Sequence, residues 1–253
     1  MARHGWRAGL ALCLLATLTA AQDTAKPDET AEPEFVPAKF STLFFEEDWS
    51  WVDDEEKTTD HIYPEMKWVD WGGGWYATFS AQIRYRYQNE KNKSLMGTSP
   101  ERNDFNLFRT RVGTRVQHES GWAFYVEAID ARMQGNDRPA TPIDRNDADT
   151  TNAFVEYATD VGQGRVTARG GRMELLEGAQ RLISPLDWAN TRRTFQGGLV
   201  RWEEGSHKTD VFWTKPVRVE PRDWDSTNTS ANFGGIYHTI NPDDGGTIDL
   251  FGL

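Results

Sequence analysis

Arginine is the residue type that points most directly to chemistry in this chain. After residue 74 the sequence holds 18 arginines and only 4 lysines. A guanidinium group stays charged at any working pH, and its planar fork of donors matches a carboxylate with two hydrogen bonds. Rings of such groups are how pores select anions. The strand patterns described below place nine arginines on one side: Arg84, Arg86, Arg109, Arg111, Arg115, Arg165, Arg169, Arg201 and Arg218.

Pairing with carboxylates is the alternative use of these arginines. Glu127, Glu156 and Asp210 fall on the same side of their strands, so salt bridges that only hold the strands in place are a competing interpretation. The bases on this side outnumber the acids, which predicts a local positive field in a chain whose net charge is −11. We expect the arginines, together with Glu127 and Glu156, to bind an anionic solute.

Catalytic and metal sites are not predicted. Glu127, Glu156 and Glu174 are candidates for the carboxylate pair of a glycoside hydrolase, but the first two are explained as salt-bridge partners. The histidines after the first 21 residues occur singly, without the spacing of metal ligands. We therefore expect no enzyme activity and no cofactor. Calcium bound in a long loop is the alternative to a solvated loop, on three residues that carry oxygen ligands: Asp144, Asn146 and Asp149.

A run of strict alternation from Trp75 to Tyr87 is the clearest structural pattern in the chain. Its 13 residues exceed the ~10 that a tilted strand needs to cross a membrane. A half-buried strand of a soluble sandwich is the alternative, although such strands usually have only ~5–6 residues. One face carries Trp75, Ala77, Phe79, Ala81, Ile83, Tyr85 and Tyr87, and the other carries Tyr76, Thr78, Ser80, Gln82, Arg84, Arg86 and Gln88.

The same alternation predicts further strands of a transmembrane antiparallel β-barrel. In the strand that begins at Arg165, parity would turn Arg172 towards lipid, so Gly170 and Gly171 predict a bulge or the end of the membrane crossing. Long connections alternate with short ones, which is typical of outer-membrane barrels with external long loops. The other strands are 105–118, 122–130, 152–159, the end of 165–202, 208–219, 233–240 and 247–253, and the long connections are 89–103, 132–150, 176–193 and 221–232.

The first 74 residues differ in composition from the rest. Residues 1–21 have two early arginines, a short apolar run and small residues at the end, which predicts a secretory signal peptide. The single cysteine, Cys13, lies inside it. Residues 22–74 hold 15 Asp and Glu against 4 Lys, so their net charge is 4 − 15 = −11. We expect a largely disordered acidic lead-in at 22–74, with a periplasmic plug or a docking segment as the alternatives, and a barrel domain at 75–253.

The stretch from Arg165 to Trp202 carries a run of specific residue types: Gly171, Arg172, Glu174, Leu175, Gly178, Gln180, Arg181, Leu182, Asp187, Trp188, Asn190, Arg193 and Phe195. This motif resembles that of the alginate export outer-membrane porins. The resemblance implies a polysaccharide or anion pore and a barrel of about eighteen strands. Since eight or nine strands are present, we expect an incomplete copy of a longer protein, with a small closed barrel as the alternative.

The sequence therefore predicts an outer-membrane channel that passes anionic polysaccharide, or other anionic solutes, through an arginine-lined lumen. A general anion or oligosaccharide porin for uptake is one alternative, and a structural or adhesive barrel is another. The expected partners are the anionic solute, outer-membrane lipid and periplasmic assembly proteins. No nucleic-acid partner is expected, because no segment has nucleic-acid-binding character.

Overall fold

The computed structural model describes residues 40–53, 66–91, 102–137, 139–242 and 245–253. The predicted signal peptide and the first part of the lead-in lie outside the described residues. No described helix is long and apolar enough to cross a membrane. The strands are β1 (Val69–Gly72), β2 (Trp75–Lys91), β3 (Arg102–His118), β4 (Trp122–Gln134), β5 (Asn146–Val161), β6 (Gly164–Met173), β7 (Phe195–Glu204), β8 (His207–Arg218), β9 (Ser226–Thr227), β10 (Phe233–Ile240) and β11 (Ile248–Gly252), and the short 3-10 helices are η1 (Phe44–Glu46) and η2 (Ser50–Asp53).

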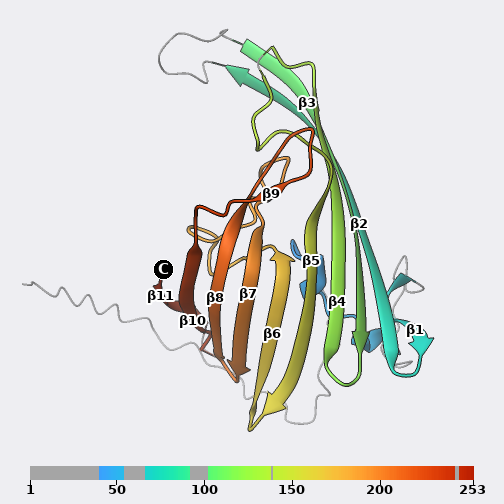
Figure 1. The fold of residues 1–253 in the computed structure, drawn as a ribbon, viewed down its shortest axis with the longest axis vertical. Helices are drawn as coiled ribbons and strands as arrows, with labels where there is room; N and C mark the ends of the chain where they lie inside the picture. Colours follow the sequence, from blue (N-terminus) through green and yellow to red (C-terminus); the bar gives the residue numbers. More distant parts are fainter. Residues whose placement is uncertain (1–39, 54–65, 92–101, 138, 243–244) are drawn as a thin grey trace, which may run out of the picture. The chain divides into compact units, whose positions relative to one another are not determined.

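These strands form one antiparallel sheet in which chain neighbours are also sheet neighbours (Figure 1). The order runs from β1 through β8 to β10 and β11, and the two-residue β9 pairs with β8. The all-β antiparallel architecture predicted from the sequence is confirmed, as are its nine strands. Two short strands, β1 and β9, were not predicted, since four and two residues are too few to show alternation.

The predicted faces of the strands are also confirmed. On β2, Ile83 is 85% exposed and Tyr85 is 60% exposed on the outward face. On β3, Arg109 and Arg111 are each 1% exposed on the other face, while Val112 is exposed between inward neighbours. Side chains of successive strand residues point to opposite sides, so the period-2 pattern fixes which residues share a face.

The long and short connections lie at opposite ends of the strands (Figure 1). The short ones are the turns after β1, β3, β5, β7 and β10. The connection from β4 to β5 is residues 135–145, shorter than the predicted 132–150, because both strands continue beyond the apolar part of their pattern. Residues 92–101 of the predicted loop 89–103 lie outside the described residues.

Of the two alternatives predicted at Gly170 and Gly171, a bulge or the end of the membrane crossing, the bulge is wrong. Strand β6 keeps continuous register with β5 and β7 through both glycines. Gly171 has φ +139°, and a Cβ there would lie 2.3 Å from the Ala153 carbonyl oxygen. The glycine therefore permits close contact between two paired strands instead of interrupting the pairing.

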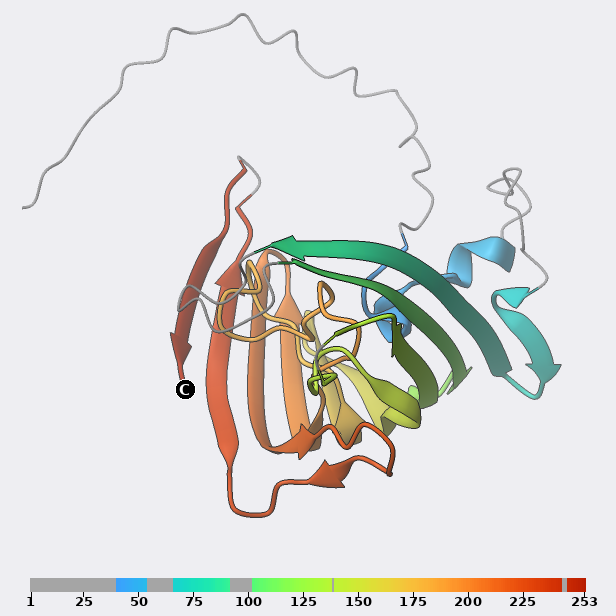
Figure 2. The same cartoon turned by 90° about the horizontal axis from the view of Figure 1, so that it is seen from above.

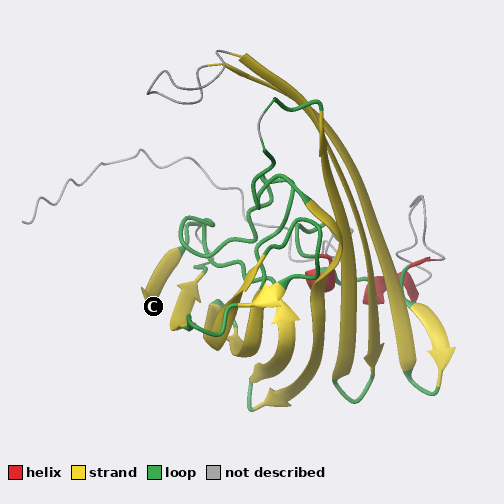
Figure 3. Cartoon of the chain, turned by 45° about the horizontal axis from the view of Figure 1, so that its top comes forward, coloured by secondary structure: helices red, strands yellow, loops and turns green. Residues whose placement is uncertain are grey.

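A second correction concerns the connection between β6 and β7, which was predicted to be an external loop at residues 176–193. It spans residues 174–194, and we call it the inward loop. It leaves β6 at the end with the long connections but turns onto the concave face of the sheet (Figures 2 and 3). Leu175 and Ile183 from this inward loop are buried with Phe212 of β8. Burial of these apolar side chains explains why the loop does not extend into solvent.

Residues 40–53 of the predicted lead-in pack against the sheet, and we call them the docked segment. Phe45 packs edge-on against Tyr125 of β4 and Phe154 of β5, with ring centroids 5.2 and 5.0 Å apart. Phe44 and Phe45 of this segment thus belong to the core. The core contains Leu43, Phe44, Phe45, Tyr125, Phe154, Met173, Leu175, Ile183, Phe195, Leu199, Phe212 and Tyr237.

Candidate solute-binding face

The arginines of β2 and β3 lie side by side on the concave face. Arg84 is paired in register with Arg109, and Gln82 with Arg111. Gln82 accepts hydrogen bonds from both Nε and Nη2 of Arg109, at 3.1 and 2.7 Å. Two-residue spacing along each strand and direct cross-strand pairing bring these guanidinium groups close together.

A buried network of two arginines and two glutamates occupies the middle of this face. Arg111 donates to both carboxylate oxygens of Glu127, at 2.8 and 3.0 Å. Arg192 of the inward loop donates to both oxygens of Glu174, at 2.5 and 3.0 Å. Arg111 Nη2 lies 3.7 Å from Glu174, which joins the two pairs. Tyr125 donates its hydroxyl hydrogen to Glu127 at 2.6 Å. All four charged side chains are fully buried, so the network holds the inward loop on the sheet.

Asp187 connects the inward loop to β3. Its carboxylate accepts from Arg109 at 2.9 Å and also from Arg192. Although burial acts in the opposite direction, Arg192 and Arg109 hold the pKa of Asp187 below its usual value. The carboxylate is therefore ionised at neutral pH, as its two guanidinium partners require.

Arg84 and Arg86 differ from the other arginines of this face. Arg84 donates to the carbonyl oxygens of Asp187, at 2.6 Å, and of Ala189, and Arg86 donates to that of Trp188 at 2.6 Å. In the described part of the chain neither guanidinium forms an ion pair. Their charges consequently remain uncompensated by a bonded carboxylate.

A second set of ion pairs lies nearer the short connections. Glu156 accepts from Arg115 at 2.8 Å and from Arg169 at 2.7 Å. Arg201 donates to both oxygens of Asp210, at 2.8 and 2.9 Å. The predicted inward arginines Arg115, Arg169 and Arg201 are thus largely neutralised by carboxylates. Arg165 lies beside Asp160 at an exposed turn, and Arg218 is exposed at the end of β8.

The motif residues of β6 and the inward loop mostly hold the loop in place. Asn190 donates to the carbonyl oxygens of Phe108, Arg132 and Asp144 at 3.0–3.1 Å, which ties the loop to β3, to β4 and to the connection after β4. Arg172 donates to the carbonyl oxygens of Thr150 and Asp225, both at 3.0 Å. Phe195 is buried and stacks on Phe233, with ring centroids 5.4 Å apart. The exposed motif residues are Gly178, Gln180, Arg181, Leu182, Trp188 and Arg193, and Gln180 accepts a hydrogen bond from Ser184 within the loop.

Glu177 anchors the start of the inward loop to β8. Its carboxylate lies 3.1 Å from Nζ of Lys208. Burial, followed by the adjacent Asp210 carboxylate, raises the pKa of Glu177 to about 8 despite the opposing effect of Lys208. Neither Glu177 nor Arg192 was singled out from the sequence, because alternation does not extend into a loop and so gives no signal for which loop side chains face inward.

The three glutamates considered for catalysis all bind arginine. Glu127 and Glu174 share the buried network, and Glu156 bridges Arg115 and Arg169. Within the described ranges no three His, Cys, Asp or Glu side chains are placed to hold a metal ion. Of the residues considered for calcium, Asn146 and Asp149 bind Asp225. Asp144 accepts from Thr141.

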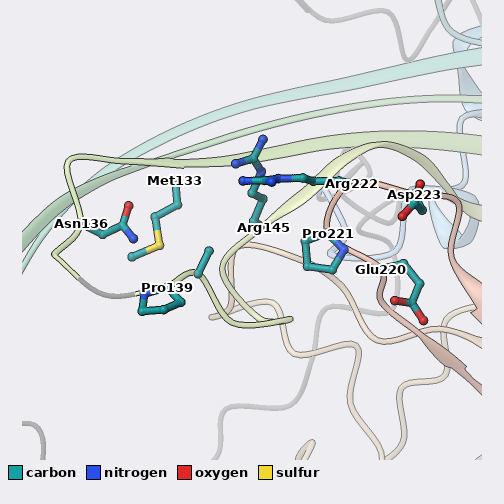
Figure 4. A pocket seen from close by; sticks show the side chains of 9 residues that line it. Met133, Asn136, Pro139, Arg145, Glu220, Pro221, Arg222 and Asp223 are labelled. Atoms are coloured by element: carbon teal, nitrogen blue, oxygen red, sulfur yellow. The ribbon is translucent and has the colours of Figure 1, made fainter.

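A cavity of about 490 Å³ opens near the long connections (Figure 4). Arg145 comes from the connection after β4, and Arg222 comes from the connection after β8. The amide of Asp147 donates to the carbonyl oxygen of Pro221 at 3.2 Å, which holds the two segments together. The other lining residues are Met133, Asn136, Pro139, Ala140, Glu220 and Asp223.

Comparison with known proteins agrees with the resemblance seen in the motif. No curated protein matches the chain. A protein family described as alginate export matches residues 75–252, which include every strand from β2 to β11. Because this match covers well over half of the chain, the protein belongs to the alginate export family.

Proposed function

We propose that this protein is an outer-membrane channel that passes an anionic polysaccharide of the alginate type along the concave face of its sheet. Membership of the alginate export family supports polysaccharide transport across the outer membrane. The observation that carries the finer proposal is the one-sided placement of the arginines, with Arg84 and Arg86 left without a bonded carboxylate.

The outward face supports a membrane location. On β4, Trp122 and Asp130 are eight residues apart, about 26 Å along a strand, which is close to the ~25 Å apolar band of an outer-membrane barrel. Near the short connections, the rings of Trp122 and Tyr157 lie 4.9 Å apart. Aromatic pairs at both limits of the band form the girdles expected at the two interfaces; the pair at the other limit is Tyr85 and Phe108.

Arg84 and Arg86 are the groups proposed to select the solute. Arg109 and Arg111 lie on the same face, but both are buried beneath the inward loop and the docked segment and are bound to carboxylates. A half-buried guanidinium whose hydrogen bonds go only to carbonyl oxygens can exchange these acceptors for a uronate carboxylate, which makes a charge-assisted and stronger hydrogen bond.

The test replaces both arginines with glutamine in the full-length protein reconstituted in planar bilayers. The wild type should favour chloride over potassium under a salt gradient and should be blocked by uronate oligomers. In the variant we expect the reversal potential to move towards zero and block to weaken by about tenfold for each lost contact, equal to about 1.4 kcal/mol. Arg132→Gln, at an exposed position on the outward face of β4, is the matched control.

Two outcomes contradict the proposal. If Arg84 and Arg86 can be neutralised without changing selectivity or block, they do not face the path of the solute. If the reconstituted wild type conducts no ions and binds no uronate oligomer, a structural or adhesive barrel is the better description.

A further inference from the structure

The docked segment supplies oxygen atoms to the arginines of the concave face. The carbonyl oxygen of Thr42 accepts from Arg111 at 3.3 Å and from Arg192 at 3.1 Å. Arg115 donates to the carbonyl oxygen of Phe45 at 3.1 Å. Oxygens of a segment only a few residues long therefore contact guanidinium groups from β3 and the inward loop.

A carboxylate and two aromatic rings complete this contact. Glu46 accepts from Arg201 Nη1 at 3.2 Å. The Phe44 ring lies 4.2 Å from the guanidinium carbon of Arg111, and the Phe45 ring lies 4.6 Å from that of Arg169. The segment thus presents carbonyls, a carboxylate and ring faces to five arginines: Arg111, Arg115, Arg169, Arg192 and Arg201.

The segment is not paired with the sheet as a strand. Its backbone-to-backbone hydrogen bonds in the described ranges are internal, from Glu46 to Leu43, from Glu47 to Phe44 and from Val52 to Trp49. The ladders from β1 to β11 are complete without it. Its removal would therefore break side-chain contacts while leaving the pairing of the strands intact.

We infer that the docked segment is an internal ligand of a second anion-binding site, formed by these five arginines, and that an anionic polysaccharide binds there by displacing it. This inference rests on the proposed function. It adds a second anion-binding site to the channel and the regulation of that site by the docked segment. Uronate carboxylates replace the carbonyl oxygens of Thr42 and Phe45, with stronger charge-assisted hydrogen bonds than carbonyls provide, and take the place of the Glu46 carboxylate at Arg201. Displacement also uncovers Tyr125 and Phe154, whose rings offer apolar faces to sugar rings.

Competition between the docked segment and the polymer should lower the apparent affinity of the polymer by a measurable factor. The apparent dissociation constant of the polymer equals its intrinsic value divided by the fraction of molecules whose segment is undocked. A segment that is undocked about one tenth of the time weakens binding about tenfold. Fixing the segment on the sheet should therefore weaken binding further, and weakening its contacts should strengthen binding.

The experiment locks and releases the segment. Cysteines replace Phe45 and Phe154, whose rings lie 5.0 Å apart, in the full-length protein. Within residues 1–253 the only native cysteine, Cys13, lies in the predicted signal peptide. The two introduced cysteines are bridged by a reducible bifunctional thiol reagent. We expect uronate oligomers, measured by calorimetry, to bind at least tenfold more weakly to the bridged protein than after reduction. Glu46→Gln, which removes the ion pair with Arg201, should strengthen binding without any bridge.

The matched control bridges cysteines at Tyr85 and Phe108, whose rings are also 5.0 Å apart but lie on the outward face. This bridge should leave oligomer affinity unchanged, and an uncharged oligosaccharide of equal length should bind to neither protein. Equal affinity of the bridged and reduced proteins, with Glu46→Gln also unchanged, would overturn the inference while anion selectivity at Arg84 and Arg86 still supported the channel. Loss of selectivity and of all oligomer binding would instead reject the channel itself.

Discussion

Arg111 and Glu127 form a fully buried, two-hydrogen-bond ion pair between adjacent strands β3 and β4. The Glu127 carboxylate also accepts hydrogen bonds from the hydroxyl groups of Tyr125, at 2.6 Å, and Thr151, at 2.9 Å. Burial of two charges is costly, and good geometry with further hydrogen bonds offsets that cost. The pair therefore depends on every one of its partners.

Removing one partner of this pair should destabilise the protein strongly. Arg111→Met leaves the Glu127 carboxylate buried without its cation, so we expect a loss of about 3–5 kcal/mol in the free energy of unfolding. The double variant Arg111→Met with Glu127→Leu should recover most of this loss. Denaturant unfolding in detergent measures both. Additive losses in the double variant would show that the two residues are not coupled.

Gly171 and Gly170 offer a comparison between adjacent positions of β6. Gly171→Ala should cost about 1–3 kcal/mol from the backbone conformation alone, because φ there is +139°. Contact of the new Cβ with the carbonyl oxygen of Ala153 adds to this cost. Gly170→Ala should be nearly neutral, since nothing lies within 4 Å of a Cβ at that position. The thermal unfolding midpoints of the two variants check this, and equal midpoints contradict it.

The inward loop should be held more firmly at low pH than at high pH. The pKa of Glu177 is raised from 4.5 to about 8 in the folded protein, so between these values the folded state binds more protons than the unfolded state. Stability of the anchored loop consequently falls as pH rises through this window. Tryptic cleavage after the exposed Arg181 should accelerate from pH 5 to pH 9, relative to Glu177→Gln at each pH. A ratio that stays constant across this range rejects the assignment.

Asn190 should limit the opening of the same loop. Asn190→Ala leaves the carbonyl oxygens of Phe108, Arg132 and Asp144 without their shared donor, and we expect about 1–3 kcal/mol of lost stability in the loop. Tryptic cleavage after Arg193 should become about tenfold faster for each 1.4 kcal/mol. Leu182→Ala, at an exposed position of the same loop, is the control. Unchanged cleavage in Asn190→Ala would show that the amide does not hold the loop.

The strands and their faces could be predicted from the sequence because sheet geometry is local. Successive residues alternate between two environments, so Ile83 and Arg84 reveal their faces without knowledge of any distant residue. The motif from Gly171 to Phe195 revealed the family for a different reason, since it is a run of specific residue types.

The inward loop and the docked segment could not be predicted in this way. Arg192 and Thr42 are hydrogen-bonded although 150 residues separate them, and Arg201 and Glu46 are paired across 155 residues. No periodic pattern encodes such irregular, long-range contacts. Composition did not reveal the docked segment either. Its aromatics are scattered among many acids without a helix or strand period, which favoured a loosely packed lead-in, whereas Phe44, Phe45 and Trp49 are buried.

The position of the docked segment has a consequence for the order of folding. The segment precedes the sheet in the chain, yet it contacts side chains from β3 to β7 and from the inward loop. The surface to which it binds therefore forms only after those elements have come together. We therefore expect docking to be a late step that follows the assembly of these elements. Substitutions such as Phe44→Ala should accelerate release of the segment and leave the rate of barrel assembly unchanged, which corresponds to φ-values near zero.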